Sequence, residues 1–261
     1  MKTSRLLFQI AAAIVLCGGL AQAQPHSAAR STSTPSLVRI QLGDKVVLVP
    51  SPEGFEEASS QFKQVQDRFV STEAPGADFL LAHLPAALCQ SLREGGPLAL
   101  ERYTKISVMK AIREQAMFDA DMAATVAELR KNGSVIFNPD GPIMKAVTEN
   151  AERGLTNLES KQIGLNLDST QNLGEFDVRP DVYSTMLLVR FTVDSEGVKS
   201  QTITLASMTV LKVKHRLLYV TVYRKISSPE GLKTELKPGV LELQQFTTKW
   251  INEILAANKD D

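Results

Sequence analysis

Three stretches rich in β-branched residues mark the C-terminal third of the chain as sheet. Residues 183–193, 201–213 and 217–224 are rich in Val, Ile, Thr, Leu and Tyr, and short polar segments at 194–197 and 214–216 separate them. Strand-forming runs joined by short polar turns are typical of antiparallel hairpins. The pattern therefore predicts a three-stranded antiparallel meander.

Shorter strands are expected in the first half of the chain. Residues 37–42 and 46–49 flank a Gly-Asp pair, which favours a hairpin, and residues 77–83 form a short apolar run. Residues 102–112 alternate between apolar and polar side chains. This alternation indicates a strand, although the Ala and Met residues nearby also allow a helix.

Apolar residues spaced three and four apart predict four helices, over residues 55–69, 119–132, 142–160 and 240–257. The first helix would carry three Phe residues on one stripe. Such a stripe is more typical of a core-facing side than of an aromatic ligand site.

Signals for helix ends support two of these segments. Asp119 fits an N-cap, and Asn132-Gly133 fits a C-terminal stop. The same Asn132 also begins a glycosylation sequon, but a helix stop explains the motif equally well. Pro142 suits a first helical position, whereas Gly154 weakens its helix by about 1 kcal/mol relative to Ala.

The order of these elements favours an α+β fold, with a mainly antiparallel sheet flanked by helices in an α/β/α sandwich-like single domain. Strands and helices come in runs, without the regular alternation of a doubly wound sheet. Residues 164–181 are polar and turn-rich, and their structure is left open. No repeat or linker interrupts residues 37–261.

A family resemblance rests on short motifs near both ends of this domain. These motifs are Val49-Pro50, Gly54-Phe55-Glu56, Trp250 and Ala256-Ala257-Asn258. In this layout the chain resembles exported bacterial proteins related to the PsbP and Mog1-like α/β/α sandwiches, over nearly all of it beyond the N-terminal segment. The resemblance implies a binding or accessory protein without a shared catalytic site, so no functional residue is carried across.

The first 23 residues have the pattern of a secretory signal peptide. Lys2 and Arg5 form a positive start, residues 6–20 are apolar apart from one Gln, and Ala21-Gln22-Ala23 matches a cleavage site. The apolar stretch is short for a membrane anchor, which needs about 20 residues. The residues before Cys17 do not match a lipobox. We therefore expect cleavage after Ala23.

Export would leave a short leader, residues 24–36, ahead of the domain at 37–261. The leader is rich in Ser, Thr and Pro and lacks large apolar residues, so it is expected to be flexible. Cys89 would be the one remaining cysteine, which excludes an internal disulfide. An exported protein without disulfides is compatible with the bacterial periplasm, where we place it.

Composition excludes several classes of function. Lys plus Arg and Asp plus Glu are both 29, so the chain lacks the basic surplus of a dedicated nucleic-acid binder. Beyond the signal no apolar run is long enough to span a membrane, so the mature protein is expected to be soluble. Hydrophobic residues make up 43%, which is ordinary for a globular domain.

Catalytic and metal motifs are missing from the sequence. It contains no G-x-S-x-G, H-E-x-x-H, C-x-x-C, calcium-loop or phosphate-loop pattern, so no catalytic, cofactor-binding or metal-binding residue is assigned. His83 and Cys89 lie in apolar surroundings that favour a core position for each. His215 lies in a polar turn and is expected to be solvated.

Charged clusters in the chain also have ordinary explanations. Glu149 and Glu152 share a helix face with Arg153, which indicates solvated pairing more than a two-carboxylate site. Asp119 and Asp121 suit a helix start. The basic cluster Lys212, Lys214, His215 and Arg216, with Arg224 and Lys225 a strand away, fits a solvated hairpin tip, or else a site for an anionic surface.

These observations favour an exported, soluble, non-enzymatic binding or accessory module whose partner is a protein or a small ligand. Two alternatives remain open. One is a hydrolase with an unrecognised site, and the other is a carrier of an apolar ligand in a groove between the sheet and the helices.

Export is directly testable. The mature protein is expected to begin at Gln24, because the cleavage motif ends at Ala23. Intact-mass analysis of the exported protein measures this. A retained Met1, or a lipid on Cys17, would contradict the prediction.

Overall fold

The computed structural model describes residues 36–259. Within them, seven strands form one sheet in the order β3-β4-β5-β9-β8-β7-β6, with every neighbouring pair antiparallel. Two more strands form a separate hairpin. The strands are β1 (Leu37–Leu42), β2 (Lys45–Pro50), β3 (Phe55–Glu57), β4 (Ala77–Pro85), β5 (Arg102–Met109), β6 (Ile163–Arg179), β7 (Val182–Ser195), β8 (Val198–Val213) and β9 (Arg216–Ile226).

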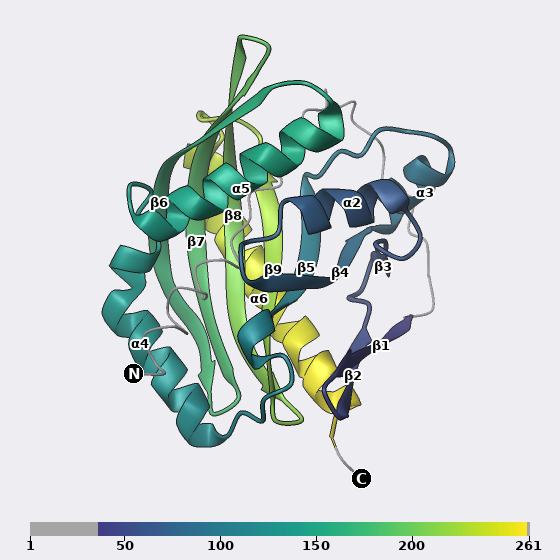
Figure 1. Ribbon diagram of the computed structural model, residues 1–261, viewed down its shortest axis with the longest axis vertical. Helices are drawn as coiled ribbons and strands as arrows, with labels where there is room; N and C mark the ends of the chain where they lie inside the picture. Colours follow the sequence, from purple (N-terminus) through teal and green to yellow (C-terminus); the bar gives the residue numbers. More distant parts are fainter. Residues whose placement is uncertain (1–35, 260–261) are drawn as a thin grey trace.

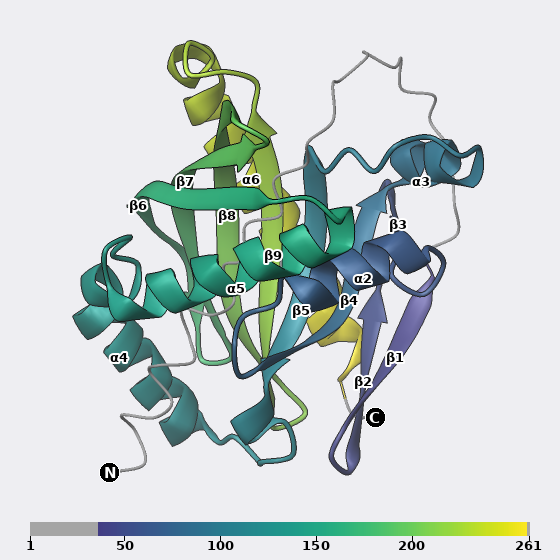
Figure 2. The same ribbon diagram turned by 45° about the horizontal axis from the view of Figure 1, so that its top comes forward.

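Helices cover both faces of this sheet (Figures 1 and 2), which confirms the expected α+β architecture. They are α2 (Lys63–Ser71), α3 (Ala86–Arg93), α4 (Asp119–Ile136), α5 (Pro142–Glu159) and α6 (Leu232–Ala257), with a short 3-10 turn at Lys110–Ile112. In Figure 1, α2, α4 and α5 lie in front of the sheet and α6 lies behind it. None of the helices in the described part of the chain is long and apolar enough to cross a membrane.

The predicted meander is confirmed as β7, β8 and β9. These strands are buried along most of their length, because helices cover both of their faces. Lys214 and His215 join β8 to β9, both with left-handed backbone (φ 48° and 57°). Two successive residues with positive φ are the signature of a tight type I′ hairpin turn, which matches the twist of the strands.

Two separate apolar clusters hold the layers together. One lies between the sheet and α2, α4 and α5, and the other lies between the sheet, α6 and the β1–β2 hairpin. The alternation of side chains along each strand divides the residues between the two faces. We call these faces the α5 face and the α6 face.

The helix expected over residues 55–69 is wrong in its first half. Phe55–Glu57 form strand β3, which pairs with β4, and the helix begins only at Lys63. The Glu57 carboxylate accepts hydrogen bonds from the Ser59 and Ser60 hydroxyls, which stabilises a turn where the periodicity predicts helix. Helical spacing of the Phe residues therefore coincides here with a strand followed by a turn.

Two other boundaries also differ from expectation. Helix α4 continues through Asn132-Gly133 to Ile136, so this pair is not a stop. Helix α6 begins at Leu232 and not at residue 240, so Pro238 lies inside the helix. The Asn132 side chain donates to Glu128 one turn earlier, a contact between neighbours on a helix surface.

Residues 164–181, left open by the sequence, belong mostly to the long edge strand β6. Its pairing with β7 shifts register three times, between Leu167 and Ser169, Asn172 and Gly174, and Glu175 and Asp177. Each bulge moves the side chains to the other face, so the strand shows no continuous alternation. Bulges also blunt an edge strand against pairing with other chains.

Gly154 allows α5 to cross α2 closely. A Cβ at Gly154 would lie 2.1 Å from the backbone oxygen of Ser71, at the end of α2. The glycine that weakens α5 locally is therefore required by the packing of the two helices.

Trp250 fixes α6 on the sheet. Its side chain is 1% exposed, its indole N–H donates to the Pro50 carbonyl oxygen at 2.8 Å, and its ring meets the His83 ring edge-on at 5.3 Å. The Trp is therefore a core residue that joins the helix to the hairpin and to β4.

Replacing Trp250 by Ala is expected to destabilise the fold by about 3–5 kcal/mol, because the cavity and the lost contacts add. At about 2–4 °C per kcal/mol for a chain of this size, the Tm falls by roughly 6–20 °C. Thermal unfolding followed by circular dichroism measures the change, with Leu241→Ala on the exposed side of α6 as the control. Equal Tm values for both variants, or water-like fluorescence of the single Trp, would contradict this role.

Candidate functional site

His83 is a neutral core residue. It is fully buried on the α6 face beside Trp250, and its Nδ1 lies 3.0 Å from the Thr104 hydroxyl. Burial lowers the pKa of His83 to about 3, because the charged form loses its hydration. The imidazole therefore stays uncharged at physiological pH.

Cys89 is equally inert. It lies in α3, is 0% exposed and belongs to the apolar cluster of the α5 face. Burial raises the pKa of its thiol to about 12, so the reactive thiolate is scarce at neutral pH.

The structure places these two residues on opposite faces of the sheet. His83 contacts the α6 cluster and Cys89 the α5 cluster, so they form no nucleophile–base pair. His215 lies in the β8–β9 turn, where its ring packs against Phe118 at 5.4 Å. It is therefore an aromatic contact as well as a turn residue.

The basic cluster is not a free cationic tip. Lys212 is 8% exposed and pairs with Asp119 and with Asp181, the latter at 2.8 Å. Arg216 is buried and pairs with Asp44, and its Nε donates to the Leu42 carbonyl at 3.0 Å. These two cations tie the β8–β9 hairpin to α4 and to the β1–β2 hairpin.

Arg224 is also engaged, since it shares the Glu242 carboxylate with Arg102, whose contact is 2.7 Å long. Arg102 in turn lies over the rings of Phe246 and Phe55, 4.7 and 5.4 Å from their centroids. The cations of this region therefore bind the α6 helix to strands β5 and β9.

The acidic candidates have structural contacts as well. Asp121 accepts the Phe118 N–H at 2.8 Å, so the capping contact belongs to Asp121 and not to Asp119. Glu152 accepts the Leu165 N–H of β6 at 2.9 Å. The expected Glu149–Arg153 pair does not form among the described residues, although both line an open groove of about 730 Å³ at the end of α5.

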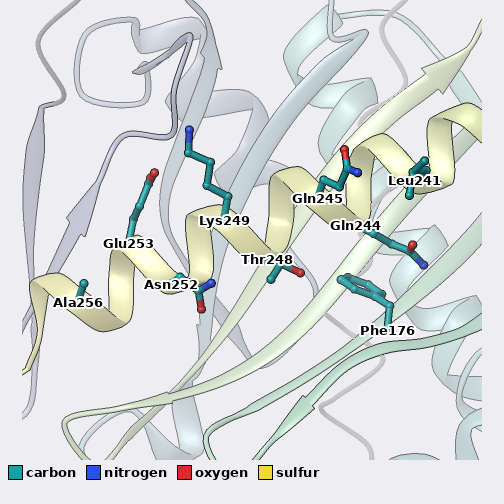
Figure 3. A pocket seen from close by; sticks show the side chains of 9 residues that line it. All are labelled: Phe176, Leu241, Gln244, Gln245, Thr248, Lys249, Asn252, Glu253 and Ala256. Carbon is teal, nitrogen blue, oxygen red and sulfur yellow. The ribbon is translucent and has the colours of Figure 1, made fainter.

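A second open groove, of about 680 Å³, runs along the outer side of α6 (Figure 3) and is called the α6 groove here. Its lining combines an apolar pair with polar, largely amide-bearing side chains of one helix stripe. It is formed by Phe176 of β6 and, on α6, by Leu241, Gln244, Gln245, Thr248, Lys249, Asn252, Glu253 and Ala256.

Three polar side chains in this groove have no partner within residues 36–259. Gln244, Gln245 and Thr248 make no side-chain hydrogen bond there, whereas the Asn252 oxygen accepts one from Arg179 at 2.8 Å. Figure 3 shows Gln244, Thr248 and Asn252 on the side of the helix that Phe176 faces. The groove therefore offers free donors and acceptors beside an aromatic ring.

The charges at the groove are partly neutralised. Lys249 pairs with Glu53 of the β2–β3 connection, and this contact raises the pKa of the lysine. The free groups in the middle of the groove are uncharged, so the groove suits a neutral polar ligand better than an ionic one.

Sequence reasoning missed this groove. Its polar residues occupy the exposed side of the expected last helix, where Gln, Thr and Asn are usually solvated. Their repeat of three and four along α6 is the one signal that groups them, and Phe176 joins them only through the fold.

Comparisons with known proteins add little to this description of the α6 groove. No protein-family model and no curated protein matches the chain. Among solved structures, the Ran-binding protein Mog1p of Saccharomyces cerevisiae gives a TM-score of 0.34 and 10% identity, covering 86% of this chain and 95% of that chain. A mutant of protein Mog1 gives 0.30 and 10%, covering 85% and 93%.

Both structures share the Mog1 name with the family that the sequence resembles. Their TM-scores are too low to support any statement about the partner or the activity of this chain. The geometry of the α6 groove is therefore the basis for a functional proposal.

The buried thiol of Cys89 gives a testable consequence. Native protein is expected to react slowly with a thiol reagent such as dithionitrobenzoate, and denatured protein quickly, because burial suppresses both access and ionisation. Absorbance during labelling measures both rates. Native labelling as fast as denatured labelling would show that Cys89 is accessible.

Proposed function

We propose that this chain is an exported, non-catalytic binding module that holds an extended segment of a partner protein in the α6 groove. The observation that carries the proposal is the stripe of unpartnered, uncharged side chains on α6 beside Phe176. Export is proposed from the signal-like first 23 residues, which lie outside the described part of the chain.

An extended polypeptide fits the spacing of this stripe. Gln244, Thr248 and Asn252 follow one another at intervals of four, which is about 6 Å along a helix. An extended chain repeats its groups on one side every 6.6–6.8 Å or so. The spacing of the stripe and the repeat of the peptide differ little, so the flexible side chains can cover the mismatch over two intervals.

The chemistry of the stripe agrees with this partner. A carboxamide both donates and accepts hydrogen bonds, as do the N–H and C=O groups of a peptide backbone. Phe176 and Leu241 supply an apolar surface for one or two side chains of the segment. From Leu241 to Ala256 the stripe is about 22 Å long, which accommodates about six or seven extended residues.

Weak, reversible binding is expected from such a surface. It has one aromatic residue and no deep apolar pocket for an anchor, and most binding energy at interfaces comes from buried aromatic and Arg anchors. Such weak affinity is sufficient for a module that holds its partner transiently.

The placement of His83 and Cys89 favours binding over hydrolysis. A hydrolase needs a nucleophile within hydrogen-bond reach of a base, and these two candidates lie on opposite faces of the sheet. The free groups of the α6 groove, in contrast, are amides and a hydroxyl, which bind but do not transfer protons near neutral pH.

A phage-displayed library of random heptapeptides tests the groove. Immobilised protein is expected to enrich uncharged sequences, and Gln244→Ala/Thr248→Ala is expected to weaken their binding about tenfold or more, since two hydrogen bonds are lost. The matched control is Gln64→Ala/Gln66→Ala, which removes exposed Gln side chains from α2 across the sheet.

Fluorescence polarisation of a labelled, enriched peptide gives the two Kd values. Equal weakening by both double variants would place binding elsewhere. Failure to enrich any sequence would contradict an extended peptide as the ligand of the groove.

A further inference from the structure

A buried ion pair lies on the α5 face, and the sheet separates it from the α6 groove. Lys105 of β5 is 2% exposed, and its Nζ lies 3.2 Å from the carboxylate of Glu73, which follows α2. Glu73 also accepts the Ala74 N–H at 3.1 Å. Charges buried this deeply persist only when they are paired, so the site is electrically neutral.

Three buried hydroxyl groups at strand positions next to Lys105 have no hydrogen-bond partners in the described structure. They belong to Ser107, Tyr219 and Thr221, each at most 1% exposed. Across the β5–β9 ladder, Lys105 is opposite Thr221 and Ser107 is opposite Tyr219. All four side chains therefore point to the same face of the sheet and occupy adjacent positions.

Unpartnered buried hydroxyls are rare in native proteins. Three at neighbouring positions beside a buried ion pair are not explained by the packing of the surrounding apolar side chains. The opposite face shows the usual solution, since the buried Thr209 and Ser184 hydroxyls bond to each other at 2.8 Å.

We propose that Ser107, Tyr219 and Thr221 form an internal binding site for hydroxyl oxygens, next to the Lys105–Glu73 pair. The oxygens come either from ordered water molecules or from a small neutral polyol. A hydroxyl guest suits these groups because Ser, Thr and Tyr hydroxyls both donate and accept hydrogen bonds. Because the charges of Lys105 and Glu73 are already paired with each other, the site favours an uncharged guest.

This proposal is independent of the α6 groove. The groove uses side chains of the outer side of α6, whereas the hydroxyl site uses side chains of β5 and β9 on the other face of the sheet. A failure of one proposal leaves the other unchanged.

A matched pair of isosteric substitutions tests the site. Thr221 and Thr209 are both fully buried in the sheet, and among residues 36–259 a side-chain partner is found for Thr209 but not for Thr221. Thr209→Val is expected to lower the Tm by about 2–4 °C, because it removes a hydrogen bond. If a guest occupies the site, Thr221→Val lowers the Tm to a similar extent.

The opposite sign would overturn the proposal. In a dry site, Thr221→Val removes an unsatisfied hydroxyl and raises the Tm, while Thr209→Val still lowers it. Ser107→Ala provides a second variant with the same two outcomes, so the conclusion does not depend on one substitution.

Two measurements separate the sources of the oxygens. Glycerol is the probe for a polyol, and a Tm rise in glycerol that is larger in the unsubstituted protein than in Thr221→Val indicates polyol binding. Equal Tm rises in the unsubstituted protein and in Thr221→Val, together with magnetisation transfer from long-lived water to the Tyr219 ring, indicate bound water. Equal rises without such transfer show that the site is dry and overturn the proposal.

Discussion

The burial of the central strands β8 and β9 on both faces is the constraint on which the rest of this structure depends. A sheet covered on one side only could expose polar residues on the other, whereas these strands carry apolar residues on both sides. Each face therefore needs its own cover. The chain supplies α2, α4 and α5 for one face, and α6 with the β1–β2 hairpin for the other.

The second cover is built from the first and last elements of the described part of the chain, the β1–β2 hairpin and α6. Trp250 bonds to Pro50, and the Asn258 side chain bonds to both backbone groups of Leu48, with its oxygen accepting the N–H at 2.8 Å. These contacts join segments about 200 residues apart without a disulfide. The closing helix is thus fixed to the first hairpin, which leaves its outer side free to form a groove.

The sequence predicts those elements whose local pattern agrees with their burial. The meander strands are continuously apolar and β-branched between polar turns, and the apolar residues of α5 form one buried stripe. Strand β6 is missed because three bulges change the face of its side chains, and β3 is missed because Phe55 happens to lie at helical distance from Ala58 and Phe62. In both cases long-range pairing overrides a local pattern.

For the candidate sites too, local features are predictable from the sequence, whereas contacts between distant segments are not. Burial of His83 and Cys89 is predictable from their apolar neighbours, and the structure confirms it for both. The partners of Lys212 and Arg216 are not predictable, because Asp119, Asp181 and Asp44 reach them only through the fold.

Amide side chains on an exposed helix face have no distinctive sequence signal, and they become a site only where a strand such as β6 brings Phe176 beside them. In a chain without catalytic motifs, the informative groups are therefore the polar ones that the fold leaves unpaired. They lie on the outer side of α6 and on β5 and β9 beneath the helices, and these are the two places where we propose that ligands bind.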